Sequence, residues 1–313
     1  MQSLIWVTLV AGAFVLNGCA IRPQPEDYAR VSAYEIVRRI RCEMRDAIRA
    51  HVIYQIADKQ SKETAAAMAS DEVYRSYTKN PKGHIDDQLQ AGIAFYYPTI
   101  VTYAFEFQIT ENNNASVSAT FEDPTSAGLF KLGLGLGADR ERQNRKVFRI
   151  TDTFGDLSMN ISDIKDIKKP DRIGYCFPQA YKHANYLYPI TGRLGLDDLV
   201  SEFLDLNQSG NLGPPDEGKT LPTTVNTLKF TTVLKSNADP NLDLPSGQRF
   251  DLVSVGGKLS VQRSDIHQVS IVMALPRDSK DGKTVAQRRI EEELNKEEER
   301  NQADRLVDRL NRL

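Results

Sequence analysis

The 313-residue sequence has few cysteines, a single tryptophan, no excess of either charge and no apolar run long enough for a membrane helix. Three cysteines are too few for a small disulfide-rich scaffold. The 40 basic and 42 acidic residues give a formal net charge of -2, which argues against nucleic acid as a partner, because neutralising phosphates requires a basic surface. Hydrophobic residues make up 40% of the chain, which is enough for a globular core.

Motifs for metal binding and common catalysis are also missing. The four histidines show no metal-ligand spacing, and neither H-E-x-x-H nor G-x-S-x-G occurs. Cys176 and His183 would make a thiol nucleophile and its base, but a structural disulfide explains Cys176 more simply. We therefore assign no catalytic residue, cofactor or metal, and keep a hydrolase with an unrecognised site as an alternative.

Residues 213–220 match the phosphate-loop pattern G-x-x-x-x-G-K-T. Pro214 and Pro215 remove two amide donors from such a loop, and Asp216 and Glu217 would repel phosphate. No strand pattern precedes the motif and no helix pattern follows it, so we exclude a nucleotide ligand. The Leu/Gly alternation of residues 133–138 weakly resembles a dinucleotide loop, but no apolar helix follows, and the alternation is typical of a strand.

The longest apolar run, Leu4–Leu16, has thirteen residues without a charge. A membrane helix needs about 20 residues, whereas thirteen suit the core of a signal peptide. The run ends in Leu16-Asn17-Gly18-Cys19, which resembles the lipobox of the bacterial lipoprotein class. The resemblance implies a signal peptide at 1–18 and a lipid anchor on Cys19.

Two details qualify this resemblance. Residues 1–3 carry no lysine or arginine, although signal peptides usually begin basic. Ala20 stands where an aspartate often retains lipoproteins at the inner membrane, which implies the outer membrane, with the protein facing the periplasm. Cleavage would leave a mature chain of 295 residues (19–313) without Trp6. The resemblance covers only the first 20 residues, and we recognise no family for the mature domain.

Cys42 and Cys176 remain after the anchor, and an oxidising compartment permits a disulfide between them. Two unpaired thiols are the alternative. A bridge would close a loop of more than a hundred residues, worth about 4–5 kcal/mol in the chain-entropy model.

The pattern of hydrophobic residues predicts three regions in the mature chain. Residues 19–98 hold the anchor, a proline-containing tether and helices, with an apolar stripe from Ala33 to Val52. The arginine-rich second face of that helix is predicted to be solvated. Residues 99–276 form a β-rich body with a helical insert at 175–206, and residues 277–313 form a charged helical or disordered tail.

Alternation with a period of two predicts the strands of the β-rich body. One hairpin is expected to turn at residues 111–114, because asparagine favours turns, and a second at residues 138–145. With the later strands this gives seven or eight antiparallel strands. The predicted fold class is α+β, with N-terminal helices, an antiparallel β-sandwich or open barrel, a helical insert and a charged C-terminal helix.

The combination of an anchor, a β-rich body and no catalytic motif favours a non-enzymatic envelope assembly or binding module, attached to the membrane at Cys19 and holding an envelope protein partner. The alternative is an oligomeric outer-membrane pore or secretion component, in which amphipathic hairpins join a shared barrel.

Overall fold

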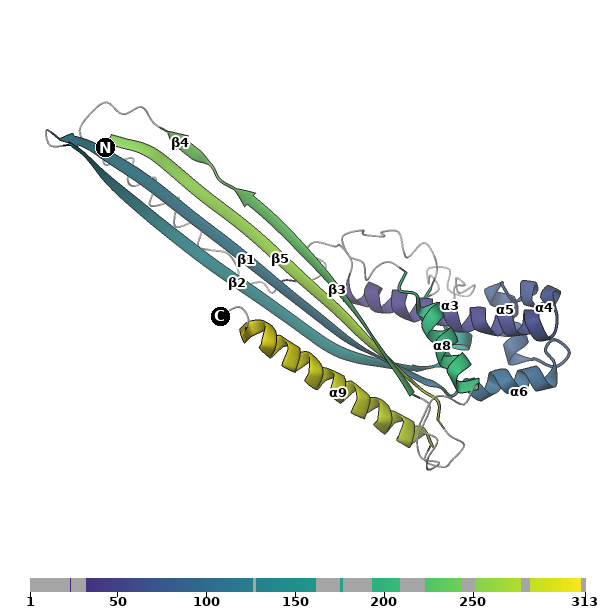
Figure 1. The fold of residues 1–313 in the computed structure, drawn as a ribbon. Coiled ribbons are helices and arrows are strands. Elements are labelled where there is room, and N and C mark those ends of the chain that lie inside the picture. The colour runs from purple at the N-terminus through teal and green to yellow at the C-terminus, as the bar shows by residue number, and fades with distance from the viewer. Residues whose placement is uncertain are drawn as a thin grey trace. The chain divides into compact units, whose positions relative to one another are not determined.

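The computed structural model is a mixed α and β structure (Figure 1). It describes residue 23 and residues 32–125, 128–161, 175–176, 193–208, 223–243, 251–276 and 282–310. The chain divides into two compact units. Unit 1 includes residues 109–144 and 233–264, and unit 2 includes residues 25–108, 145–232 and 265–313.

The strands form one open antiparallel sheet, which confirms the α+β class. Its order is β2-β1-β5-β3, and the short strand β4 pairs with β5 beside β3. The strands are β1 (Ile100–Thr125), β2 (Gly128–Thr153), β3 (Thr223–Ala238), β4 (Asn241–Asp243) and β5 (Asp251–Ala274).

Both predicted hairpin turns are wrong. Residues 111–114 lie inside β1 and residues 138–145 lie inside β2, so the two predicted hairpins are a single one made of two 26-residue strands. Glu111 accepts hydrogen bonds from Arg142 of β2 and Arg263 of β5, at 2.8 and 2.9 Å. These cross-strand ion pairs hold the polar stretches within the sheet, which local turn propensity does not predict. The described residues contain five strands instead of seven or eight.

Seven helices lie among the described residues, and none has the length and apolarity needed to cross a bilayer. Helix α3 (Ala33–Lys59) starts at a capping box, in which Ser32 and Glu35 cap each other's backbone amides. The others are α4 (Lys62–Ala67), α5 (Asp71–Lys79), α6 (Asp87–Tyr96), α7 (Phe154–Asn160), α8 (Leu196–Gln208) and α9 (Gly282–Leu310).

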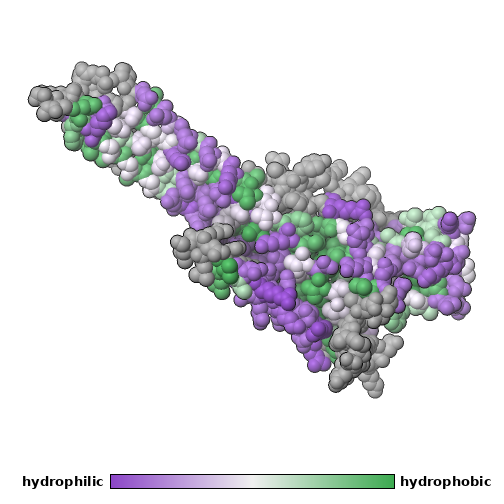
Figure 2. Space-filling view, viewed as in Figure 1, coloured by the Kyte–Doolittle hydropathy of each residue, from purple (hydrophilic) through white to green (hydrophobic). Residues whose placement is uncertain are grey.

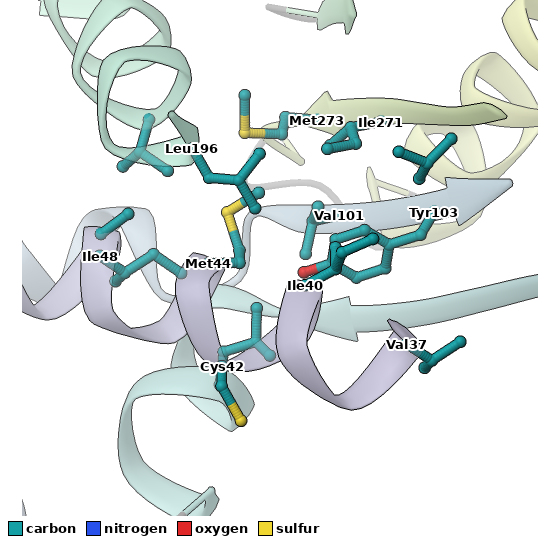
Figure 3. Close-up of a cluster of buried hydrophobic side chains, with 14 of the residues drawn as sticks. Val37, Ile40, Cys42, Met44, Ile48, Val101, Tyr103, Leu196, Ile271 and Met273 are labelled. Carbon is teal, nitrogen blue, oxygen red and sulfur yellow. The ribbon is translucent and has the colours of Figure 1, made fainter. Parts of the chain in front are cut away.

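The core of unit 2 lies between the sheet and helices α3, α7 and α8. Tyr103, Phe105 and Phe107 of β1 point to this side at alternate positions and are almost fully buried. Ile40 and Met44 of α3 and Ile271 and Met273 of β5 close the same cluster, part of which Figure 3 shows. Burial raises the pKa of Tyr103 well above its usual value.

A second, smaller cluster holds α9 against the sheet. Ala286, Ile290 and Leu294 are buried against residues of β1 and β5. Beyond this stripe, Glu297 accepts a hydrogen bond from Thr227 of β3 at 2.9 Å. The first half of the charged tail is therefore a packed helix, because an apolar residue recurs on one side every four residues.

The arginine-rich face of α3 is not solvated, which corrects the prediction. Arg45 and Arg49 are buried. Arg49 donates to the carbonyl oxygens of Ser158 and Ile161 and pairs with Asp71 of α5. A planar guanidinium with five donors is suited to such a site, because its N–H groups find acceptors on several elements. Arg49 thus links α3 to α5 and α7.

Replacing Asp71 with alanine should destabilise unit 2 by about 3–5 kcal/mol, because the buried Arg49 cation would lose its carboxylate. The matched control is Asp197→Ala, which breaks the exposed Arg193–Asp197 pair and should cost less than about 1 kcal/mol. Thermal unfolding followed by helical circular dichroism measures both. Equal losses of stability in the two variants would show that the buried pair contributes no more to stability than the exposed one.

Candidate functional site

The candidate functional site is the sheet of unit 1, which has two chemically different faces. The ion pairs from Glu111 to Arg142 and Arg263 place these three side chains on one face. Alternation along each strand then assigns the other residues to that face or to the opposite one. Beyond Glu111 this face also carries Asn113 and Asp123 of β1 and Arg140 of β2. Its apolar residues are Val117, Ala119 and Phe121 of β1, Phe130, Leu132, Leu134 and Leu136 of β2, Leu234 of β3, and Val255, Leu259 and Val261 of β5.

Much of this apolar face is open to solvent. Leu136 is 82% exposed and Leu134 is 54% exposed, and Val117, Phe130, Leu259 and Val261 are each about half exposed. Leu242 of β4 pairs directly with Val255 and is 59% exposed. In the view of Figure 2, hydrophobic residues recur along the part of the sheet near β4. A contiguous exposed apolar surface of this kind marks contact with a partner or a membrane.

The opposite face of unit 1 is polar or has no side chain. Ser260 of β5 donates to Asn237 of β3 at 2.9 Å on this face. Gly133 and Gly135 also belong to it, and a methyl group added at either would meet no atom within 4 Å. Further residues of this face are Ser116, Ser118 and Thr120 of β1, Lys131, Asp139 and Glu141 of β2, and Lys258 and Gln262 of β5. Leu129 and Val233 are its apolar exceptions.

The apolar face has a defined height. On β2 it runs over nine residues, Phe130–Ala138, in which every second side chain is apolar. Nine residues correspond to about 30 Å along a strand, and a membrane strand has about 9–11 residues. On the same face, Arg140 and then the ion pairs of Glu111 with Arg142 and Arg263 follow this stretch. An apolar band that ends at a row of charges resembles in its chemistry a bilayer core and its interface.

Among the described residues, one edge of the sheet is β2 and the other is β3 together with the short strand β4, and both edges are open. Long edge strands are normally protected by charges, prolines or bulges, since their unpaired N–H and C=O groups invite pairing. Residues 132–138 of β2 carry no charge and no proline. The site therefore presents a free edge next to an exposed apolar face.

The structure describes only some of the candidate residues that the sequence suggested. Cys19, the phosphate-loop pattern at 213–220 and His183 lie outside the described residues. Cys42 of α3 and Cys176 form a disulfide in the structure, with their Cα atoms 5.6 Å apart. Residues 133–138 belong to β2, as the strand interpretation predicted.

The environment of the disulfide joins three segments. Arg41, next to Cys42, donates to Asp152 at the end of β2 at 2.7 Å and to the hydroxyl of Tyr175 at 3.0 Å. Burial alone would lower the pKa of Arg41, but the hydrogen bonds and charge of Asp152 raise it above its usual value. The guanidinium therefore stays charged and holds α3, β2 and the Tyr175 segment together.

The described histidines do not form a cluster. His267 lies against the ring of Phe107, and His84 stacks on Tyr77. His51 is half-buried beside an apolar pocket. No group of three potential metal ligands occurs within the part of the chain that the structure describes.

Sequence reasoning found the alternation in β1 and β2 but missed that each pattern is continuous. The signal was present: residues 130–138 and 115–121 are both apolar at every second position. The predicted turns divided them, so a single amphipathic sheet with two faces was not recognised.

The chain matches a protein family over nearly its whole length. A family model described as "Uncharacterised protein y4kA" covers residues 22–309. A curated relative, "Uncharacterized protein y4kA" of Sinorhizobium fredii (strain NBRC 101917 / NGR234), is 30% identical over an alignment of 288 residues that covers 88% of this chain and 85% of the relative. This corrects the expectation that no family is recognised beyond the first 20 residues.

Similar solved structures include secretins of bacterial secretion systems. The open-gate secretin InvG of the Salmonella SPI-1 type III injectisome has a TM-score of 0.27 and 7% identity, over 67% of this chain and 70% of that one. The Klebsiella pneumoniae type II outer membrane complex of PulD, PulS and the PulC HR domain has a TM-score of 0.23 and 8% identity, over 62% and 43%. Likenesses this weak establish neither fold nor function.

Proposed function

We propose that this chain, which belongs to the Y4kA family, is a subunit of an oligomeric pore in the bacterial cell envelope. Several copies would join the sheets of unit 1 edge to edge into one closed barrel that crosses a membrane. The observation that carries the proposal is the exposed apolar face of unit 1, which is nine residues tall on β2 and ends at the Glu111 ion pairs.

The strand directions allow such a barrel to close. In the order β2-β1-β5-β3, neighbouring strands are antiparallel, so the terminal strands β2 and β3 run in opposite directions. The free edge of β2 in one copy can therefore pair with the free edge of β3 in the next copy, and the alternation continues around a ring. This contact joins two unlike edges, and unlike contacts related by rotation build closed rings.

The two faces have consistent roles in this arrangement. The apolar face would lie against lipid, where a hydrogen-bonded closed sheet leaves no backbone group unsatisfied. The face with Gly133, Gly135 and the serines of β1 would line a water-filled interior. A protein that stays in water normally covers an apolar surface of this extent, which is why we favour a pore over the envelope assembly or binding module that ranked first from the sequence.

The lipobox resemblance supports an envelope location, with the Cys19 lipid holding each subunit at the outer membrane until the barrel forms. Replacing Cys19 with serine should abolish incorporation of labelled palmitate and leave the precursor, with its Trp6, uncleaved. Metabolic labelling and the mass of the mature protein test this. A labelled Cys19→Ser protein would contradict it, as would a mature wild-type chain that still contains Trp6.

Cysteine cross-linking tests the barrel directly. Asp139 of β2 and Lys235 of β3 are exposed and lie on the polar face, one on each terminal strand. We expect the double variant Asp139→Cys/Lys235→Cys, in membranes, to give a ladder of dimers, trimers and larger species with a short bismaleimide.

The single variants distinguish the kind of contact. Either one alone should give no dimer, and a mixture of the two should give dimers that contain both. Dimers of Asp139→Cys alone would mean that two β2 edges pair, which does not build a ring. An absence of cross-links in every combination would contradict the proposed function.

A further inference from the structure

An apolar groove in unit 2 is not explained by the proposed pore. It has a volume of about 370 Å³, within the range of small-molecule sites. Its walls come from helices α3, α6, α7 and α8, and they include Val52, Leu89, Ile93, Phe154 and Leu204. We call this cavity the α3/α6 groove.

Helix α6 lacks a full packing partner on this side. It carries Leu89, Ile93, Phe95 and Tyr96, yet none of its ten residues is buried. Phe95, which lines the groove, is 55% exposed. An apolar helix gains its stability from tertiary packing, so an occupant of the groove would cover surface that α6 leaves open.

The polar side chains that line the groove favour a ligand with a negative charge. His51, Gln55 and Lys59 follow one another at four-residue steps along α3 and line the groove. The amide nitrogen of Gln55 lies 3.4 Å from Nε2 of His51. Burial lowers the pKa of His51, and the nearby Asp205 carboxylate opposes that shift. Among the described lining residues Lys59 is a cation and none is a carboxylate. Asp205 acts electrostatically on His51 and Tyr96 but does not line the groove.

We infer that the α3/α6 groove binds a single-chain amphiphile with an anionic head, of the fatty-acid class. Its alkyl chain lies between Leu89 and Ile93 of α6 and Phe154 and Leu204 opposite, and its carboxylate lies near the Lys59 ammonium. Gln55 is within the same row and donates to the carboxylate. The inference is independent of the pore, because every residue of the groove belongs to unit 2.

The test uses the full chain in amphipol, titrated calorimetrically with octanoate, decanoate and laurate below their micelle concentrations. We expect about a sixteenfold gain in affinity for each two methylene groups, since each buried methylene contributes about fourfold. Dodecyltrimethylammonium, with the same chain length as laurate and a cationic head, should bind at least tenfold more weakly than laurate.

Two variants locate the site. Gly92 shares the groove face of α6 with Leu89, Ile93 and Tyr96, and a side chain added there meets no atom within 4 Å, so Gly92→Phe should fill the groove without disturbing the fold. It should weaken laurate binding at least tenfold, whereas Ala91→Phe, next to it and outside the groove, should change binding less than twofold.

Lys59→Gln should weaken laurate at least fivefold and remove the preference over the cationic amphiphile. Equal affinity of Gly92→Phe and Ala91→Phe for laurate would overturn the inference, as would equal affinity of the wild-type chain for the two head groups or no measurable laurate binding.

Discussion

Replacing Leu134 with arginine should abolish insertion of the assembled protein into membranes. Leu134 lies in the middle of the nine-residue apolar stretch of β2 and is half exposed. An arginine that faces lipid near the bilayer midplane costs about 2–4 kcal/mol per chain, and a ring repeats that cost in every subunit. Carbonate extraction followed by native electrophoresis should find the variant only as monomer, outside the membrane fraction.

The adjacent residue provides the control. Gly135 is on the same strand but on the polar face, and a side chain added there meets no atom within 4 Å. Gly135→Arg should therefore assemble and insert as the wild type does, and in planar bilayers it should shift ion selectivity toward anions, because it adds a positive charge to the interior. If Leu134→Arg inserts as well as Gly135→Arg, the apolar face does not meet lipid.

Loss of the Cys42–Cys176 bridge should destabilise unit 2 by about 4–5 kcal/mol. The two residues are 134 positions apart, so the bridge removes the entropy of a long loop from the unfolded chain. Cys176→Ser and Cys42→Ser should lower the thermal unfolding midpoint by the same amount, and a reductant should lower that of the wild type but not that of the variants. Peptides with Cys42 and Cys176 alkylated in the unreduced native protein would contradict a formed bridge.

The sequence was sufficient to predict the fold class but not the lengths of the strands in the sheet. The α3 stripe was predictable because burial on one side of a helix requires apolar residues every three or four positions. The length of β1 was not, since Asn112, Asn113 and Asn114 have a high turn propensity, whereas the pairing with β2 and β5 and the ion pairs of Glu111 with Arg142 and Arg263 hold the strand through this stretch. Such pairs join residues far apart in sequence.

The burial of Arg49 could not be predicted for the same reason. Its acceptors, which include Asp71 and the carbonyl oxygen of Ser158, come from helices that only the tertiary structure brings to α3. The α3/α6 groove was also hidden, because the α6 segment has apolar residues around much of its circumference and no clear stripe. The open edges of β2 and β3 follow from the sheet order, which strand patterns alone do not fix.

Electron microscopy of the full chain, extracted from outer membranes in detergent, tests the pore most directly. We expect ring-shaped particles with rotational symmetry, in which β2 of each subunit lies beside β3 of the next around a central opening. Particles of a single subunit, or a closed pair with the apolar faces of unit 1 packed on each other, would contradict it.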